Sequence, residues 1–124
     1  MEQSPSIRVA RVYDDLDAGE GARVLVDRLW PRGLSKESAA LDEWCRDVAP
    51  STELRTWYRH DPARFDEFAA RYRAELTEPD RAEAVAALQS RYADRQLILL
   101  TATKDLELSH ATVLAGILSG SDQT

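Results

Sequence analysis

Cysteine is nearly absent from this chain of 124 residues, and Cys45 is its only example. One cysteine cannot form an internal disulfide or build a cysteine-based zinc site, so both are excluded. Histidine is almost as scarce, and His60 and His110 show neither the HxxH nor the HExxH spacing of a metal centre. We therefore expect no metal site, and the sequence identifies no cofactor.

Long apolar runs and standard catalytic loops are missing as well. No run approaches the roughly 20 apolar residues that span a bilayer. The first residues, Met-Glu-Gln-Ser-Pro-Ser, lack the basic start and apolar centre of a signal peptide. The motifs GxGxxG, GxxxxGKS/T and GxSxG do not occur. We therefore expect a cytoplasmic protein without membrane contact.

No part of the chain concentrates charge of one sign. The net charge is -6, with 9 basic and 11 acidic side chains in residues 1–60 and 7 and 11 in residues 61–124. Nucleic-acid binding requires a concentrated basic face that displaces counterions from phosphates. We therefore do not expect a nucleic-acid partner, although a local basic pocket stays possible. The oligomeric state cannot be read from these features.

The segments that are present alternate between strand-like and helix-like patterns. Short β-branched or apolar runs predict strands at residues 7–13, 23–28, 41–47 and 97–100, of which the last is the most apolar. Helical spacing and capping residues predict helices that begin at Ser51, at Asp61–Pro62, near residue 80 and near Leu106, with Gly120 placed to cap the last one. Strands separated by helices imply a parallel or mostly parallel sheet.

The expected fold is thus a single compact α/β domain over residues 7–120. Its central sheet would have about four strands, mostly parallel and flanked by helices. Residues 1–6 are expected to form a disordered tail.

Two polar clusters directly follow two of the predicted strands. DRLWPRG, residues 27–33, follows the strand at 23–28, and TATKD, residues 101–105, follows the strand at 97–100. Ligands of open α/β sheets bind outside the carboxyl ends of the strands. If the two strands are neighbours, both clusters and the start of the last helix converge. We predict a binding pocket there, formed by Asp27, Arg28, Trp30, Arg32, Thr101, Lys104 and Ser109.

The side chains of these clusters favour an anionic ligand. Guanidinium and ammonium groups bind phosphates and carboxylates, so the expected partner is a small phosphorylated, nucleotide-like or carboxylate molecule. Trp30 would form a wall of the pocket. His110, at the start of the last helix, is the candidate for proton transfer near neutral pH. These residues do not decide whether the protein is an enzyme.

Other interpretations remain open. The same pocket would serve a non-catalytic sensor. Alternatively, the turn at residues 30–32 is a structural clamp in an interaction protein, with Arg28 paired to Asp27, Asp42 or Asp47. A DNA-binding regulator ranks last, because the helical middle of the chain leads into an apolar strand and not into a β-wing. Cys45 is expected to pack, since a nucleophilic thiol requires exposure and a lowered pKa.

Four blocks of the sequence are similar to a known family. They are RVYD at 11–14, RVLVDRLWPRG at 23–33, LDEWCRDVAPSTELR at 41–55 and LILLTATKDLELSHATVLAGIL at 97–118. Together they resemble the domain of unknown function 488 family, and in particular its YeaO-like branch, over nearly the whole chain. The resemblance implies an α/β domain with a central sheet and no established biochemical activity.

At the predicted site, this sequence differs from the pattern of the family that it resembles. The wider family typically has a cysteine at the end of the last strand and a Cys-His pair at the start of the last helix. This sequence has Thr101 at the first place and Ser109–His110 at the second. Cysteine-based or metal chemistry therefore does not carry over. What is left resembles a binding pocket that lost its nucleophile or never needed one.

Overall fold

The computed structural model describes residues 7–13, 21–93 and 96–119. Its strands are β1 (Ile7–Arg11), β2 (Ala22–Leu25), β3 (Glu43–Trp44) and β4 (Leu97–Thr101). Its α-helices are α1 (Lys36–Ala39), α2 (Thr52–Tyr58), α3 (Phe65–Glu75), α4 (Pro79–Arg91) and α5 (His110–Ser119). Single 3-10 turns lie at Arg46–Val48, Pro62–Arg64 and Leu106–Leu108. The expected tail at residues 1–6 and the expected cap at Gly120 fall outside the described residues.

The four strands form one parallel sheet in the order β1-β4-β2-β3, which confirms the predicted α/β class. β4 occupies a central place, where Leu99 pairs with Val9 of β1 and Val24 of β2. All five residues of β4 are buried, as expected for a parallel strand covered on both faces. Because β2 and β4 are parallel neighbours, their carboxyl ends lie side by side.

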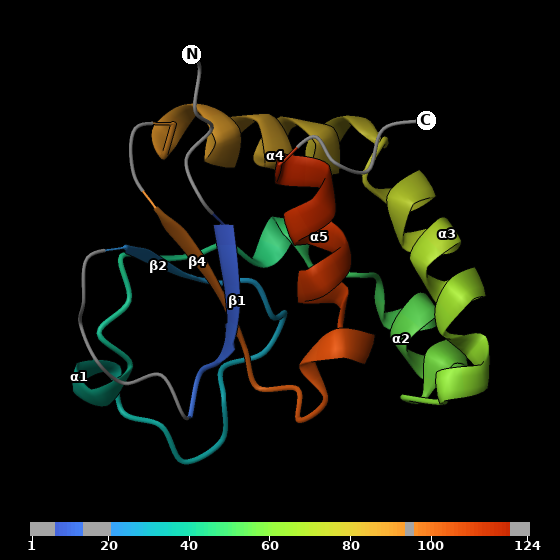
Figure 1. Ribbon diagram of the computed structural model, residues 1–124, viewed down its shortest axis with the longest axis horizontal. Coiled ribbons are helices and arrows are strands. Elements are labelled where there is room, and N and C mark those ends of the chain that lie inside the picture. The colour runs from blue at the N-terminus through green and yellow to red at the C-terminus, as the bar shows by residue number, and fades with distance from the viewer. Residues whose placement is uncertain (1–6, 14–20, 94–95, 120–124) are drawn as a thin grey trace.

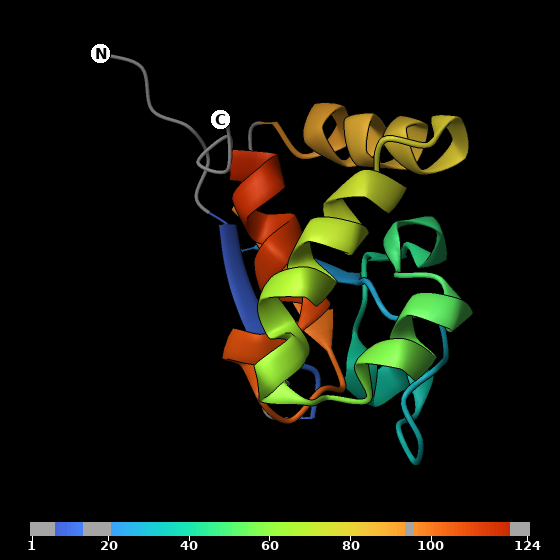
Figure 2. The same cartoon turned by 90° about the vertical axis from the view of Figure 1, so that its right-hand side faces the viewer.

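The helices lie mainly on one face of the sheet. Figures 1 and 2 show α2 to α5 gathered on that side, where they pack against alternate strand residues such as Val24 and Leu99. The residues between them, Leu25, Ile98 and Leu100, face the opposite side. The alternation follows from the period of two in a β-strand. It divides the core into two apolar clusters.

The second face is covered by the segment from residue 30 to residue 44. Trp30 and Trp44 pack edge to face there, with ring centroids 5.2 Å apart. Arg23 of β2, only 2% exposed, donates from Nε and Nη2 to the carbonyl of Ala39 and from Nε to that of Ala40. A buried guanidinium thus satisfies the end of α1 and holds this segment to the sheet.

Local sequence signals explain where most elements begin. Ser51 caps α2, as predicted, by accepting a hydrogen bond from the backbone N–H of Leu54 at 3.1 Å. Asp61 caps a 3-10 turn that leads into α3. The last helix differs from the prediction, since residues 106–108 form a 3-10 turn and α5 begins at His110.

The strand predicted at residues 41–47 is shorter than expected. β3 has two residues, although Asp42 and Cys45 on either side donate to the carbonyls of Arg23 and Leu25, each at 2.8 Å. A 3-10 turn begins at Arg46 and ends the pairing. Cys45 is buried, and burial raises its pKa to about 11, with the charge of Glu43 adding to the effect. The expectation that this thiol packs is confirmed.

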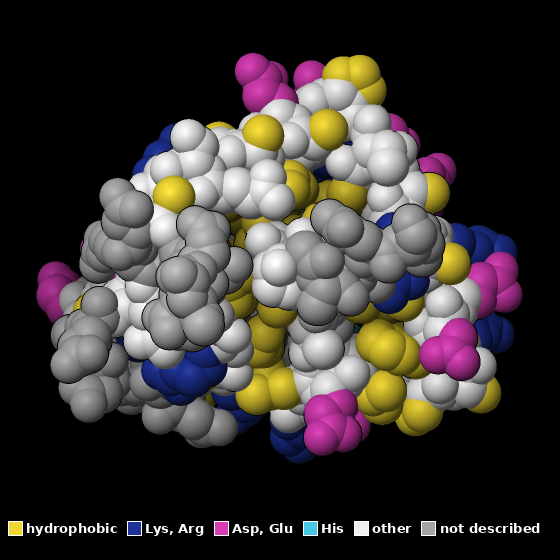
Figure 3. Space-filling view, turned by 45° about the horizontal axis from the view of Figure 1, so that its top comes forward, with side chains coloured by type: hydrophobic (Ala, Val, Ile, Leu, Met, Phe, Trp, Pro, Cys, Tyr) yellow, Lys and Arg dark blue, Asp and Glu magenta, His cyan; other side chains and the backbone are white. Residues whose placement is uncertain are grey.

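On the face shown in Figure 3, both basic and acidic side chains of the described residues lie at the surface, together with exposed apolar atoms. No helix in the described ranges is long and apolar enough to cross a bilayer.

Candidate functional site

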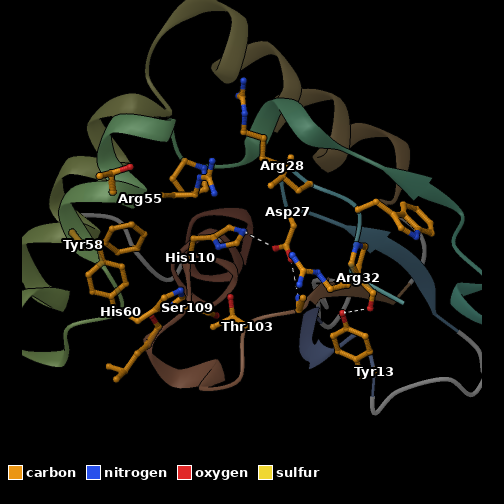
Figure 4. A pocket seen from close by; sticks show the side chains of 18 residues that line it. Tyr13, Asp27, Arg28, Arg32, Arg55, Tyr58, His60, Thr103, Ser109 and His110 are labelled. Carbon is orange, nitrogen blue, oxygen red and sulfur yellow. Dashed lines mark hydrogen bonds and ion pairs between the residues drawn. The ribbon is translucent and has the colours of Figure 1, made fainter. Parts of the chain in front are cut away.

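A cavity of about 530 Å³ opens outside the carboxyl ends of β2 and β4. In Figure 4, Asp27 and His110 lie near its centre, with Arg55, Tyr58 and His60 on one side and Arg32 and Tyr13 on the other. Its volume lies within the range of small-molecule sites. The cavity is lined by Tyr13, residues 27–32, Pro50, Arg55, Thr56, Tyr58, His60, Phe68, Ala102, Thr103 and residues 108–110.

Asp27 joins three elements at the floor of this cavity. Its Oδ1 accepts a hydrogen bond from the Thr101 hydroxyl at 2.7 Å, and its Oδ2 accepts one from the backbone N–H of Ala102 at 2.8 Å. Nε2 of His110, at the start of α5, lies 3.3 Å from Oδ1. Asp27 therefore ties the end of β2 to the end of β4 and to α5.

The surroundings of Asp27 favour its charged form. Burial by itself raises the pKa of a carboxyl group, because it penalises the ion. The hydrogen bond and charge of His110 oppose burial, and the Ala102 N–H and Thr101 hydroxyl add to them, so that the pKa of Asp27 is lowered below its ordinary value. The carboxylate is thus ionised at neutral pH, and each of its oxygens accepts from at least one internal donor.

His110 is held as a hydrogen-bond donor at Nε2. This nitrogen lies 3.0 Å from the carbonyl oxygen of Val26. Because a carbonyl oxygen carries no proton, Nε2 carries the hydrogen, which it shares between Val26 and the Asp27 carboxylate. The ring is further enclosed by Tyr72, which meets it edge to face with centroids 5.9 Å apart.

Three arginines line the cavity without a carboxylate partner. For Arg28, Arg32 and Arg55, no ion pair is found among the residues that the structure describes. Nε of Arg55 is buried without a hydrogen-bond partner, and its Nη2 makes only a long contact of 3.4 Å with Thr52. These guanidinium groups are therefore not committed to an acidic side chain within the described part of the chain.

The wall beside Arg55 is aromatic and comes from the end of α2. The Tyr58 ring stacks on Phe68 with centroids 4.2 Å apart, and its hydroxyl donates to the carbonyl of Leu108 at 2.7 Å. Burial, followed by the charges of Asp105 and Asp61, raises the pKa of Tyr58. His60 is exposed at the mouth, and its centroid lies 5.9 Å from that of Tyr58.

The structure brings most of the predicted site residues together and leaves one aside. Lys104 is exposed and does not line the cavity. Thr101 is fully buried beneath it, against Asp27. Trp30 lines the cavity, but its Nε1 donates to the carbonyl of Leu34, and its ring rests on Trp44.

Ser109 has a structural use at the start of α5. Its hydroxyl donates to the carbonyl of Leu106 at 2.7 Å and faces the N–H of Thr112 at 3.4 Å, as a helix cap does.

The Pro31–Leu34 turn beside the cavity has Gly33 at its third position with φ +78°, which residues with a Cβ rarely adopt.

Sequence reasoning missed the contribution of α2 to the site. Arg55, Tyr58 and His60 were not predicted there, because helical spacing does not reveal which helix end meets the strand ends. One signal was present: Arg55 closes the block LDEWCRDVAPSTELR, which resembles the family as strongly as the block around Arg28.

Comparison with known proteins settles the family. The model of DUF488-N3i, described as the inactive DUF488-N3 subclade, matches residues 6–123. The chain belongs to the DUF488 family. Uncharacterised proteins of Mycobacterium tuberculosis and Mycobacterium bovis are each 48% identical over 120 residues, which cover 97% of this chain and 99% of each relative. The uncharacterised protein YeaO of Escherichia coli is 39% identical over 111 residues, 89% of this chain and 94% of its own. No solved structure matches.

Membership of the DUF488 family confirms the resemblance found in the sequence. The two hydroxyl residues that stand where that resemblance places cysteines are both engaged, Thr101 with Asp27 and Ser109 with Leu106. Cys45 lies in the core and does not line the cavity.

Proposed function

We propose that this member of the DUF488 family binds a small anion in the cavity and does not transform it. The observation that carries the proposal is the charge of the cavity wall. Among the described residues that line it, Arg28, Arg32 and Arg55 are basic and Asp27 alone is acidic, in a chain whose net charge is -6. A cluster of guanidinium groups in a protein of negative net charge favours the recognition of phosphate or carboxylate.

The internal bonding of Asp27 strengthens this argument. A free carboxylate at the centre of the cavity would repel an anion. Here Thr101, Ala102 and His110 donate to both of its oxygens, so its negative charge is stabilised from within the protein. The arginines are left to the ligand.

The same contacts disfavour a structural clamp. A clamp requires Arg28 or Arg32 to pair with a nearby aspartate. Asp27 already accepts hydrogen bonds from donors within the protein. Asp42 accepts a hydrogen bond from the backbone N–H of Arg23 at 2.8 Å. Within the described part of the chain, neither arginine forms an ion pair. The unpaired guanidinium groups thus favour a ligand over a clamp.

Three features support binding without catalysis. The family description itself reads inactive. The hydroxyls of Thr101 and Ser109 are used in hydrogen bonds within the protein. Nε2 of His110 donates to a backbone carbonyl, so this nitrogen is engaged within the protein. We therefore assign His110 the task of holding Asp27 in place, in contrast to the proton transfer suggested by the sequence.

Thermal unfolding with added anions tests this function. Inorganic phosphate, adenosine monophosphate and citrate are titrated against the wild type, Arg55→Gln and the control Arg91→Gln, whose arginine pairs with Glu43 on the surface. A ligand at 100 times its Kd adds about 2.7 kcal/mol of stability, a shift of several degrees. Loss of a charge-assisted hydrogen bond in Arg55→Gln should raise Kd about tenfold or more.

Two results would contradict the proposal. The first is a wild type that none of the anions stabilises. The second is an equal loss of affinity in Arg55→Gln and Arg91→Gln, since that would trace binding to net charge and not to the cavity.

A further inference from the structure

We propose that the ligand carries a planar aromatic ring next to its anionic group, and that His60 is the residue that contacts this ring. The inference rests on the proposed anion binding and specifies the chemical class of the ligand. It fits a molecule of the size of a mononucleotide or an aryl phosphate, with the anion at Arg55 and the ring at the mouth of the cavity.

The first observation is the backbone at the end of α2. Arg59 and His60 both have positive φ, 51° and 55°, in the left-handed region. That region is disfavoured for residues with a Cβ; glycine occupies it most readily, and asparagine, aspartate and histidine are the most frequent of the other residues. Arg59 ends the helix, where its N–H donates to the carbonyl of Arg55 at 3.1 Å. The turn explains why residue 60 is left-handed, but it does not explain why residue 60 is a histidine.

Strain that persists at the edge of a cavity is often linked to function. Of the two strained residues, His60 lines the cavity and Arg59 does not. A glycine at position 60 would relieve the strain and remove the imidazole. We infer that the imidazole is kept because it contacts the ligand.

The second observation is a series of aromatic rings that leads outward to His60. Tyr72 packs on Phe68, Phe68 on Tyr58 and Tyr58 on His60, with centroid separations of 5.9, 4.2 and 5.9 Å. The three inner rings are buried, and His60 is exposed. A flat ring placed on His60 would extend this series by one member, at a favourable distance for aromatic pairs.

The third observation is the apolar surface next to His60. Tyr58 and Leu108, which the hydrogen bond from the Tyr58 hydroxyl joins, line the cavity there and carry no charge. An anion as small as inorganic phosphate is satisfied by the arginines alone and would make no contact with this wall. Small-molecule sites combine an apolar lining with a few polar groups that fix orientation. The wall is therefore suited to the uncharged part of a larger ligand.

The experiment compares three phosphates that differ only in their organic group: methyl, cyclohexyl and phenyl phosphate. Kd is measured by calorimetry for the wild type, His60→Gly, His60→Phe and Arg59→Gly. Arg59→Gly is the matched control, because it relieves the same kind of backbone strain one residue away from the cavity.

We expect phenyl phosphate to bind the wild type at least fivefold more tightly than cyclohexyl phosphate, in line with the strength of stacking on aromatic side chains. The ratio of the Kd of cyclohexyl phosphate to the Kd of phenyl phosphate should fall to about one in His60→Gly. It should keep its wild-type value in His60→Phe and Arg59→Gly. Both glycine variants should melt no lower than the wild type, since each relieves a left-handed residue. If His60→Gly does not fold, His60→Asn, which tolerates the same φ, replaces it.

The outcomes separate this inference from the function on which it rests. If none of the three phosphates binds the wild type, anion binding itself fails. If all three bind equally, or if the preference survives in His60→Gly, the ring contact is refuted while anion binding stands. An equal loss of preference in Arg59→Gly and His60→Gly would also refute it, since the turn and not the imidazole would then be responsible.

Discussion

Replacing Asp27 should reveal how much stability the contacts at the floor of the cavity supply. The side chain is 16% exposed and receives the Thr101 hydroxyl, the Ala102 N–H and Nε2 of His110. In Asp27→Ala the Ala102 N–H loses its acceptor, which costs about 1–3 kcal/mol, and a hydrogen bond to a charged group is lost, at about 1.5–3 kcal/mol. The Thr101 hydroxyl can turn to Thr103, 3.1 Å away. We expect a total loss of about 3–5 kcal/mol.

Asp27→Asn should cost less, because its amide oxygen can still accept from the Ala102 N–H. What it loses is the negative charge and the acceptor beside His110, and we expect a decrease of about 1–2 kcal/mol in the free energy of unfolding. Against a total stability of about 5–15 kcal/mol for a domain, both changes are measurable by urea unfolding, provided that the m-value is unchanged. Asp47→Asn, at an exposed residue, is the control and should stay within about 0.5 kcal/mol of the wild type.

The pH dependence gives a second measure of the same contacts. The pKa of Asp27 is lowered in the folded state. Its contribution is therefore present above the pKa of the unfolded chain, about 3.9, and is lost as pH falls through the folded value. The difference in stability between the wild type and Asp27→Asn should accordingly shrink below about pH 4. A constant difference from pH 7 to pH 2, or an Asn variant as unstable as the Ala variant, would refute the reasoning.

Two further predictions concern the helical side of the fold. The Cys45 thiol is buried with its pKa raised to about 11, so alkylation at pH 8 should be at least about tenfold slower in the native protein than in urea; equal rates would contradict its burial. Ser51→Ala removes the cap that accepts from Leu54 and a hydroxyl that donates to Glu75, and should lower the free energy of unfolding by about 1–2 kcal/mol. Thr52→Ala, one residue along, is the control for the urea titration, and an equal loss in both variants would argue against capping by Ser51.

The fold class could be predicted because each segment shows its own period. The run at 97–100 is apolar throughout, and the structure places it at the centre of a parallel sheet, where both faces are covered. The capping of α2 by Ser51 could also be predicted from the sequence, since this residue directly precedes a helical pattern. These features depend on neighbours in the sequence, which is why periodicity reveals them.

The site was only partly predictable because it depends on contacts between distant residues. Placing Asp27 against Thr101 requires that β2 and β4 be neighbours, and 74 positions separate the two side chains. Arg55 and His60 line the cavity because the end of α2 borders it, and no periodicity encodes this placement. Lys104 shows the opposite case: it follows β4 directly in the sequence, but its side chain is exposed and does not line the cavity.

The strand order has a consequence for how the chain folds during synthesis. β1 and β2 do not pair with each other, and both pair with β4, whose residues follow theirs by about 75–90 positions. A ribosome therefore releases most of the chain before the sheet can be completed: β2 can pair early with β3, but β1 has no pairing partner until β4 is made. Such long-range pairing slows folding and prolongs the exposure of apolar strands. The floor of the cavity forms in the same late step, because Asp27 meets Thr101 only when β4 takes its place.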